Sequence, residues 1–297
     1  MALDAIPSCM PPDFKPRRPI MEFPPLACDC HAHVCGPEKI YSYAAQRIYT
    51  PRDCLVTDYE HLLDVLGVAR AVLIQPSFYG ADNSAMLAAM RSARRPVRGV
   101  AVVKDEITDG ELQSLHEVGI RGVRFNIVDV AQSKGDLPLN RIRRLAERVK
   151  PFDWHIELLM HVDECPDLDR KFADFPVDVV FGHLGYVRTD KGVGDTGFQA
   201  LLRLLKSGRA WVKLTGPYRI STLGAPHPDT TAFAHALLAA EPTRLVWGSD
   251  WPHVKGEWSI PMPNDADLAD LLQTWVPDAD LRKQMLVDNA ARLYGFD

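Results

Sequence analysis

Four histidines and one aspartate are the residues of this sequence best suited to chemistry: His31, His33, His161, His183 and Asp250. Histidine can bind a metal ion, transfer a proton or donate a hydrogen bond to a carbonyl oxygen. Aspartate is ionised at neutral pH and can serve as a metal ligand or a general base. All five follow or end apolar runs of strand type. A single histidine in such a run is usually a core residue, but five residues at equivalent ends of four runs favour one shared site.

The segment 28–35, CysAspCysHisAlaHisValCys, places two of these histidines among three cysteines. Successive side chains of a strand point to opposite faces. Asp29, His31 and His33 are therefore predicted to share one face, and Cys28 and Cys30 to share the other. With the histidines facing a site, these two cysteines become small buried hydrophobic residues that face outward, not metal ligands. The chain shows no export signal, so its six cysteines are predicted to be free thiols.

Eight apolar runs of strand type would position these residues. They span residues 27–34, 69–76, 97–103, 120–127, 154–162, 178–185, 210–216 and 244–251. Amphipathic helical patterns alternate with them at 57–66, 83–93, 108–118, 139–149, 198–206 and 231–240, and two more close the chain at 266–276 and 280–294. Thr57 with Glu60 and Thr108 with Glu111 each have the spacing of a helix capping box. Strands and helices thus alternate along the chain.

Eight such units in a chain of 297 residues predict a single-domain α/β fold, the (β/α)8 TIM barrel. The alternative is a doubly wound open sheet, which needs fewer strands and usually has a glycine-rich turn after the first one. Here the first strand leads into HisAlaHisValCysGlyPro, which favours the barrel. Residues 1–25 hold seven prolines and are predicted to form an extended arm, with the barrel at 26–297. Barrel chemistry gathers at the carboxyl ends of the strands.

The overall charge gives little sign of a macromolecular partner. A net charge of −5 and a pI near 6.1 lack the basic footprint of a protein that binds nucleic acid or an anionic membrane surface. No apolar run approaches the roughly 20 residues of a membrane helix. We therefore expect a cytoplasmic protein that acts on a small molecule, as a monomer or a homo-oligomer.

Several motifs resemble those of a known family. HisAlaHis on the first strand, PheGlyHisLeuGly around His183 and TrpGlySerAspTrpProHis around Asp250 are similar to the amidohydrolase superfamily (amidohydrolase family 2), in the branch of 2-pyrone-4,6-dicarboxylate hydrolases and related lactonases. Further matching segments lie at 49–53, 75–83, 121–126 and 288–294. The resemblance covers nearly the whole chain after Pro25. HisXHis alone is weak evidence, whereas its combination with GlySerAspTrpProHis is specific for the branch.

The resemblance implies a hydrolase of the carboxylic ester class that opens an anionic lactone, such as 2-pyrone-4,6-dicarboxylate or a sulfo- or carboxy-muconolactone. Asp250 would be the general base, and His31, His33 and His183 would polarise the ring carbonyl. A second possibility keeps the same site but adds one divalent ion, with Zn²⁺ as the expected metal. His31, His33, His161 and Asp250 would then hold it, because metal-binding members of the superfamily have a ligand where His161 stands.

The resemblance also implies the substrate contacts. Arg124 and Arg219 would bind carboxylate or sulfonate groups, for which a guanidinium is well shaped. Tyr49, Ser77 and His253 would add hydrogen bonds.

Two departures from the family pattern concern the substrate. Lys134 stands in a loop where the dicarboxylate hydrolases have an arginine, and Leu159 or Met160 where they have a tyrosine. The alternatives are a metal-dependent decarboxylase of the same superfamily, a sugar-acid lactonase, and a barrel that binds without catalysis.

Overall fold

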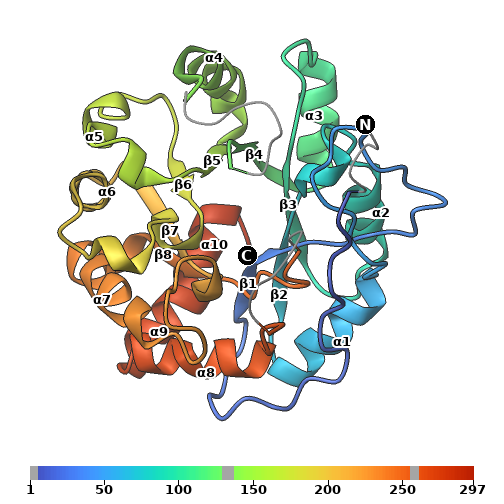
Figure 1. The fold of residues 1–297 in the computed structure, drawn as a ribbon. Coiled ribbons are helices and arrows are strands. Elements are labelled where there is room, and N and C mark those ends of the chain that lie inside the picture. The colour runs from blue at the N-terminus through green and yellow to red at the C-terminus, as the bar shows by residue number, and fades with distance from the viewer. Residues whose placement is uncertain (1–5, 129–136, 255–260) are drawn as a thin grey trace, which may run out of the picture.

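A computed structural model describes residues 6–128, 137–254 and 261–297. Eight parallel strands follow one another in sequence order, and a parallel bridge between Ala32 and Trp251 joins the end of the series to its beginning (Figure 1). The predicted TIM barrel is confirmed. The strands are β1 (Cys28–Ala32), β2 (Arg70–Ile74), β3 (Val97–Ala101), β4 (Ile120–Asn126), β5 (His155–Leu159), β6 (Val179–Phe181), β7 (Ala210–Leu214) and β8 (Leu245–Trp247).

Helices form a ring around the strands (Figure 1). They are α1 (Val56–Leu66), α2 (Ser84–Ser92), α3 (Asp109–Glu117), α4 (Leu139–Val149), α5 (Leu168–Lys171), α6 (Thr196–Lys206), α7 (Thr231–Ala240), α8 (Asp265–Trp275), α9 (Ala279–Lys283) and α10 (Ala290–Tyr294). A π-helical turn, Gln284–Asn289, joins α9 to α10, so the predicted helix 280–294 is one continuous segment. Sequence patterning did not predict α5, which has only four residues.

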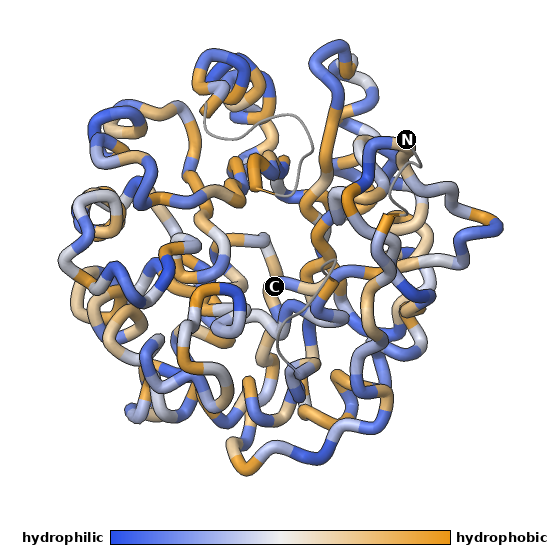
Figure 2. The backbone as a smooth tube through the Cα atoms, in the orientation of Figure 1, coloured by the Kyte–Doolittle hydropathy of each residue, from blue (hydrophilic) through white to orange (hydrophobic). Residues whose placement is uncertain are grey.

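Two apolar layers hold the fold together. The larger cluster contains the outward side chains of the strands, such as Leu73, Ile156 and Leu158, and the helix residues that pack on them. Figure 2 shows the hydrophobic colour running along the strands, whereas the helices alternate between hydrophilic and hydrophobic segments. A smaller cluster fills the inside of the barrel with Val72, Ile74 and other strand residues. Burial of these apolar surfaces is the main force that stabilises a barrel of this kind.

A bulge in β1 changes the predicted side-chain alternation. Asp29 pairs with Ala71 and Ala32 pairs with Leu73. Between these two pairs β1 advances by three residues and β2 by only two. Cys28 and Cys30 belong to the cluster inside the barrel, and Asp29 contacts Tyr59 of the surrounding helix α1. The prediction that the two cysteines face outward and that Asp29 shares the face of His31 is therefore wrong, because an extra residue in a bulge breaks the alternation. All six cysteines are free, as predicted, and all six are buried.

The C-terminal segment closes the amino end of the barrel. The Arg70 guanidinium, at the start of β2, donates to the carbonyl of Val287. The Tyr294 ring lies 5.4 Å from that of His155, the first residue of β5, and Phe296 lies under Arg70 and Arg98. We call this end, with His155, Arg70, Arg98, Tyr294 and Phe296, the barrel floor.

The helix starts follow the predictions only in part. Thr108 and Glu111 form the expected capping box at α3. At α1, Asp58 accepts from the N–H of Leu55 instead, and Glu60 pairs with Arg94. Thr57 with Glu60 is therefore not a capping box, because α1 begins one residue earlier than the pattern suggested.

The Pro-rich N-terminal segment runs along the barrel as far as α8. Cys9 donates its N–H to the carbonyl of Thr50, and Arg17 pairs with Asp267 and Asp270. Among the residues described, none of the helices has the length and apolarity needed to traverse a lipid bilayer.

Candidate active site

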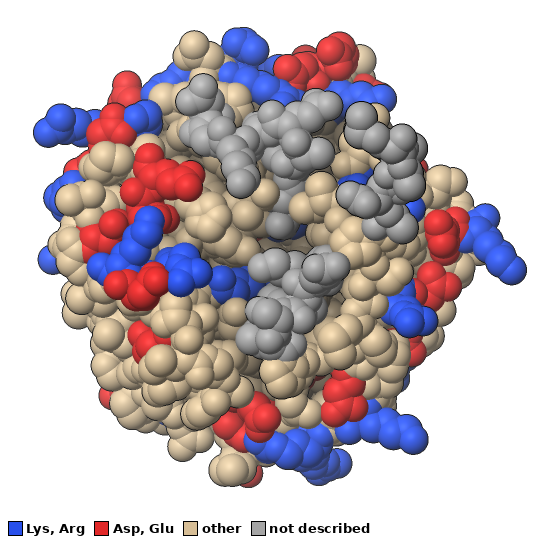
Figure 3. Space-filling model, in the orientation of Figure 1, with Lys and Arg blue, Asp and Glu red and all other residues tan. Residues whose placement is uncertain are grey.

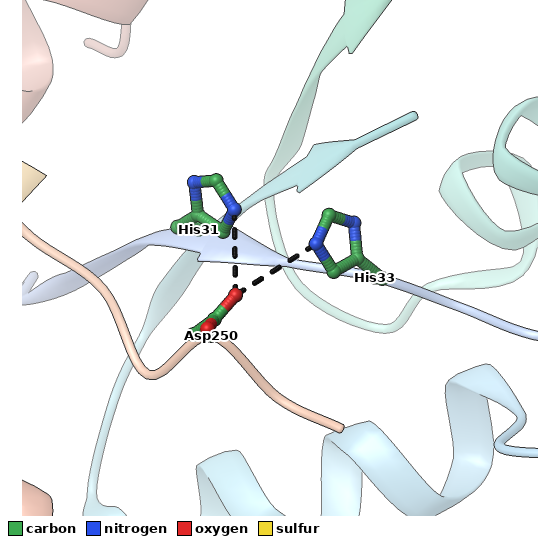
Figure 4. Close-up of side chains that lie close together, drawn as sticks. All are labelled: His31, His33 and Asp250. Atoms are coloured by element: carbon green, nitrogen blue, oxygen red, sulfur yellow. Dashed lines mark ion pairs between the residues drawn. The ribbon is translucent and has the colours of Figure 1, made fainter. Parts of the chain in front are cut away.

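His31, His33 and Asp250 meet at the carboxyl end of the barrel (Figure 4). The Nε2 atoms of His31 and His33 lie 3.5 and 3.8 Å from the same oxygen, Oδ1 of Asp250. One potential ligand atom from each residue lies within 4.8 Å of the other two, close enough for one divalent ion. Within the described residues, neither Asp250 Oδ1 nor His31 Nε2 has a hydrogen-bond partner. Buried polar atoms rarely lack one, so this is where a substrate, water or ion belongs.

The second oxygen of Asp250 is held firmly. Oδ2 accepts hydrogen bonds from the Tyr218 hydroxyl at 2.5 Å and from Nε of Arg219 at 2.6 Å. Burial by itself would raise the pKa of the Asp250 carboxyl, but the adjacent Arg219 guanidinium opposes it, and the pKa lies below its ordinary value. Asp250 is thus an oriented carboxylate with one oxygen engaged and the other directed at the site.

The histidines around this carboxylate are neutral. Burial, reinforced by Arg124, lowers the pKa of His33 to about 3. Burial also holds the pKa of His31 and of His183 well below the usual range. The His183 ring lies 5.1 Å from the His31 ring. At neutral pH each ring therefore has one N–H donor and one acceptor nitrogen.

Three residues around the site have a left-handed backbone conformation, which is unusual for residues other than glycine. His183, Asp250 and His253 all have φ between 50° and 64°. Such left-handed conformations are costly for non-glycine residues and cluster at functional sites. They also explain why the strands end earlier than predicted: β6 ends at Phe181 and β8 at Trp247, so His183 and Asp250 lie in the turns that follow.

A small pocket opens beside this cluster. Its lining includes His33 and His183 together with the side chains predicted to bind substrate, Tyr49, Ser77, Arg124 and Arg219. The hydroxyls of Tyr49 and Ser77 lie 3.1 Å apart. Arg124 donates to the carbonyl of Gln75 at 3.0 Å, and Arg219 to that of Val254 at 3.2 Å. Figure 3 shows most charged side chains at the periphery, while a few Lys and Arg side chains reach the middle of this face.

Two predicted site residues lie elsewhere. His161 is half-buried, contacts the carbonyl of Tyr186 through Nδ1 at 2.9 Å, and lines a different pocket with Glu164 and Cys165. It does not join the cluster of potential metal ligands found among the described residues. His253 is fully buried, with Nδ1 2.9 Å from the Tyr218 hydroxyl and Nε2 3.2 Å from Asp265. Lys134 lies outside the described residues.

Three buried polar residues at the site were missed by sequence reasoning: Tyr218, Glu157 and Lys213. Glu157 of β5 and Lys213 of β7 point into the barrel beneath His31 and form an ion pair of 2.6 Å. The signal was a charged residue inside an apolar run, as in AlaTrpValLysLeu and HisIleGluLeuLeu. Charged residues are almost never fully buried unless they are paired. The two charged residues in these apolar runs could therefore have been predicted to pair with each other.

A roomier hollow lies away from this site. It has a volume of about 590 Å³ and is lined by residues 81–118, among them Leu87, Ile107 and Leu115. Three of its polar lining residues are already engaged: Asn83 with the backbone of Val102, Glu111 in the cap of α3, and Ser114 with the carbonyl of Gly110. The chemistry therefore belongs to the smaller pocket at the strand ends.

Comparisons with known proteins identify the family. The family model described as Amidohydrolase matches residues 28–296. A 4-sulfomuconolactone hydrolase of Rhizobium radiobacter is 37% identical over 98% of this chain and 97% of its own. A 2-pyrone-4,6-dicarboxylate hydrolase of Comamonas testosteroni is 36% identical over 94% of this chain and 93% of its own. The solved structure of a probable 2-pyrone-4,6-dicarboxylic acid hydrolase from Acinetobacter baumannii, with bound citric acid, superposes with a TM-score of 0.79 at 29% identity, covering 91% of this chain and all of the other. The chain belongs to the amidohydrolase family.

Proposed function

We propose that this protein hydrolyses a small anionic lactone, as the names of its relatives from Rhizobium and Comamonas indicate for those proteins. The observation that carries the proposal is an oriented carboxylate among neutral histidines, directly beside a pocket that His33, His183 and two arginines line. The cations suit the carboxylate or sulfonate of the substrate. The carboxylate and histidines suit the attack of water on its ring ester.

Asp250 acts as the general base. A water molecule between Oδ1 and the lactone gives up a proton to Asp250 while its oxygen bonds to the carbonyl carbon. The ring C–O bond then breaks, and the departing ring oxygen takes the proton back. The product is an open-chain hydroxy acid, or its keto tautomer.

The base is weak, so the oxyanion needs strong stabilisation. Because Arg219 keeps the pKa of Asp250 low, the carboxylate is ionised but holds a proton poorly. The catalytic gain must then come from donors aimed at the carbonyl oxygen in a buried site, where hydrogen bonds act with little competition from water. We assign this role to the neutral rings of His31 and His183, which lie beside Asp250.

A divalent ion is the alternative source of activation. The atoms of His31, His33 and Asp250 lie close enough to share one ion, and a bound ion would acidify the attacking water. Two observations count against this fit. The Lys213 ammonium lies 3.3 Å from His31 Nδ1, and Arg219 already neutralises Asp250. We therefore propose hydrolysis by the side chains alone, and His161, outside the trio, has no part in it.

A panel of lactones tests the function. We expect 2-pyrone-4,6-dicarboxylate or 4-sulfomuconolactone to be opened with release of one proton per turnover, and an uncharged pyrone to react far more slowly. Ring opening is measured by absorbance and proton release by pH-stat, with the products identified by mass spectrometry. Release of CO2 would instead support a decarboxylase. Binding of the lactones without turnover would support a non-catalytic barrel.

A further inference from the structure

Lys213 lies directly beneath the active site, inside the barrel. The side chain is fully buried, and its Nζ has three neighbours. These are the carbonyl oxygen of Cys30 at 2.8 Å, Oε2 of Glu157 at 2.6 Å and Nδ1 of His31 at 3.3 Å. An ammonium group has three N–H donors and no acceptor. The carbonyl of Cys30 and Nδ1 of His31 lie at hydrogen-bond distance from this donor, and Glu157 neutralises its charge as an ion pair.

The charge of this lysine is set by its surroundings. Glu157 is as deeply buried as Lys213, and its other oxygen lies 3.9 Å from Nε of Arg124. A buried carboxylate without a cation would be costly, and so would a buried ammonium without an anion. The pair is stable as an ion pair, so Lys213 can only donate to His31.

We propose that Lys213, held by Glu157, is a positioning residue that fixes His31 as the tautomer with its proton on Nε2. A neutral imidazole has a single N–H. Nδ1 is the acceptor here because the Lys213 ammonium lies 3.3 Å away, whereas the nearest carboxylate oxygen, Oε1 of Glu157, lies at 3.7 Å, beyond hydrogen-bond distance. The proton then lies on Nε2, 3.5 Å from Asp250 Oδ1, and faces the site. This inference rests on the proposed lactone hydrolysis for its purpose: His31 donates to the carbonyl oxygen as negative charge develops on it.

The neighbouring histidine has the opposite tautomer. Nδ1 of His33 lies 2.7 Å from the carbonyl oxygen of Ile74, which can only accept, so the proton of His33 lies on Nδ1. Its Nε2 therefore presents a lone pair to the site. His31 and His33, two residues apart, offer a donor and an acceptor: the first suits the carbonyl oxygen and the second suits the attacking water.

The assignment has a consequence for metal binding. A histidine binds a metal ion through an unprotonated nitrogen. His33 offers one at Nε2, whereas His31 can do so only by losing its interaction with Lys213. Zn²⁺ binding should therefore be weak in the wild type and stronger when Lys213 is removed.

The tautomers can be measured directly. Long-range ¹H–¹⁵N NMR spectra of the full chain, labelled with ¹⁵N at histidine, distinguish Nε2–H from Nδ1–H rings. The signals are assigned by their loss in His31→Gln and His33→Gln. We expect Nε2–H for His31 and Nδ1–H for His33. In Lys213→Met, which keeps the side-chain length without a donor, His31 should shift toward Nδ1–H while His33, the internal control, stays unchanged. An Nδ1–H signal for His31 in the wild type would overturn the proposal, and so would an unchanged His31 signal in Lys213→Met.

Lys213→Met leaves Glu157 unpaired and can fail to fold for that reason. The double variant Lys213→Met/Glu157→Gln removes both charges and serves as the second test of the same tautomer shift. Titration with ZnCl2, followed by calorimetry, should show tighter binding to the double variant than to the wild type, and equal affinities would count against the assignment. None of these readouts needs a substrate. If no lactone is hydrolysed while His31 carries its proton on Nε2, only the proposed function fails.

Discussion

His33 at the carboxyl end of the barrel and His155 on the floor are two buried histidines with opposite surroundings. The pKa of each is lowered to about 3, in both cases chiefly by burial, with Arg124 adding to the effect at His33 and Lys213 at His155. His33 has a hydrogen bond at Nδ1 and faces Asp250 with Nε2. His155 packs edge-on against Tyr294, and neither of its ring nitrogens has a hydrogen-bond partner among the described residues. A perturbed pKa thus marks burial, and the convergence of several polar groups marks the site.

The largest expected effect is the loss of turnover when the general base at the carboxyl end of the barrel is removed, compared with a substitution on the barrel floor. Asp250→Asn keeps the volume but removes the proton acceptor, and a general base contributes about 10²- to 10⁴-fold to the rate. We expect kcat to fall by about this factor with an unchanged circular dichroism spectrum. His155→Gln on the floor is the matched control and should retain activity close to that of the wild type. Near-normal turnover by Asp250→Asn would remove Asp250 from its proposed role.

A smaller effect is expected for the arginine that lines the pocket. Arg124→Met removes hydrogen bonds to an anionic group, each worth about 1.5–3 kcal/mol, so KM for anionic lactones should rise roughly 10- to 100-fold. Arg98→Met on the floor should leave KM unchanged. Steady-state kinetics with an anionic and an uncharged lactone make the comparison, and an equal loss of kcat/KM for both substrates would contradict a role in anion binding.

Arg219→Met should also lower kcat, because Arg219 orients Asp250.

The smallest effect concerns the pH dependence of stability on the floor. An unfolded histidine takes up a proton near pH 6.5, whereas folded His155 stays neutral down to about pH 3. Acidification from pH 6.5 toward 3 therefore favours the unfolded chain. Urea unfolding at pH 7.5 and pH 5 should show that His155→Gln reduces the stability lost on acidification by up to about 2 kcal/mol. Parallel losses in the variant and the wild type would indicate that His155 is already protonated at pH 5.

Much of the architecture could be predicted because barrels repeat one pattern. Each of the eight strands lies within a predicted apolar run, and His31, His33, His183 and Asp250 lie at the same end of the barrel, since parallel strands bring their carboxyl ends together. Strand alternation failed in β1 because nothing in a single sequence reveals that one residue is accommodated in a bulge.

Other parts of the site depend on contacts between distant segments. Tyr218 and Lys213 acquire their roles only when β7 and the turn after it approach Asp250 and His31. His161 has the residue type and position of a ligand, yet its ring packs against that of Tyr186, which in turn contacts His183. Residue type and order along the chain do not determine which way these side chains point.

The bulge in β1 also bears on how this enzyme can change. It lets a single strand send Asp29 outward, where the carboxylate accepts from Tyr59 and Ser249, while His31 faces inward to Lys213. Cys30 is the only residue between them, and its deletion would restore a regular pleat in which Asp29 still faces outward and His31 still faces inward. Substitution libraries leave this spacing intact, so insertion and deletion scanning is the mutagenesis that would expose it.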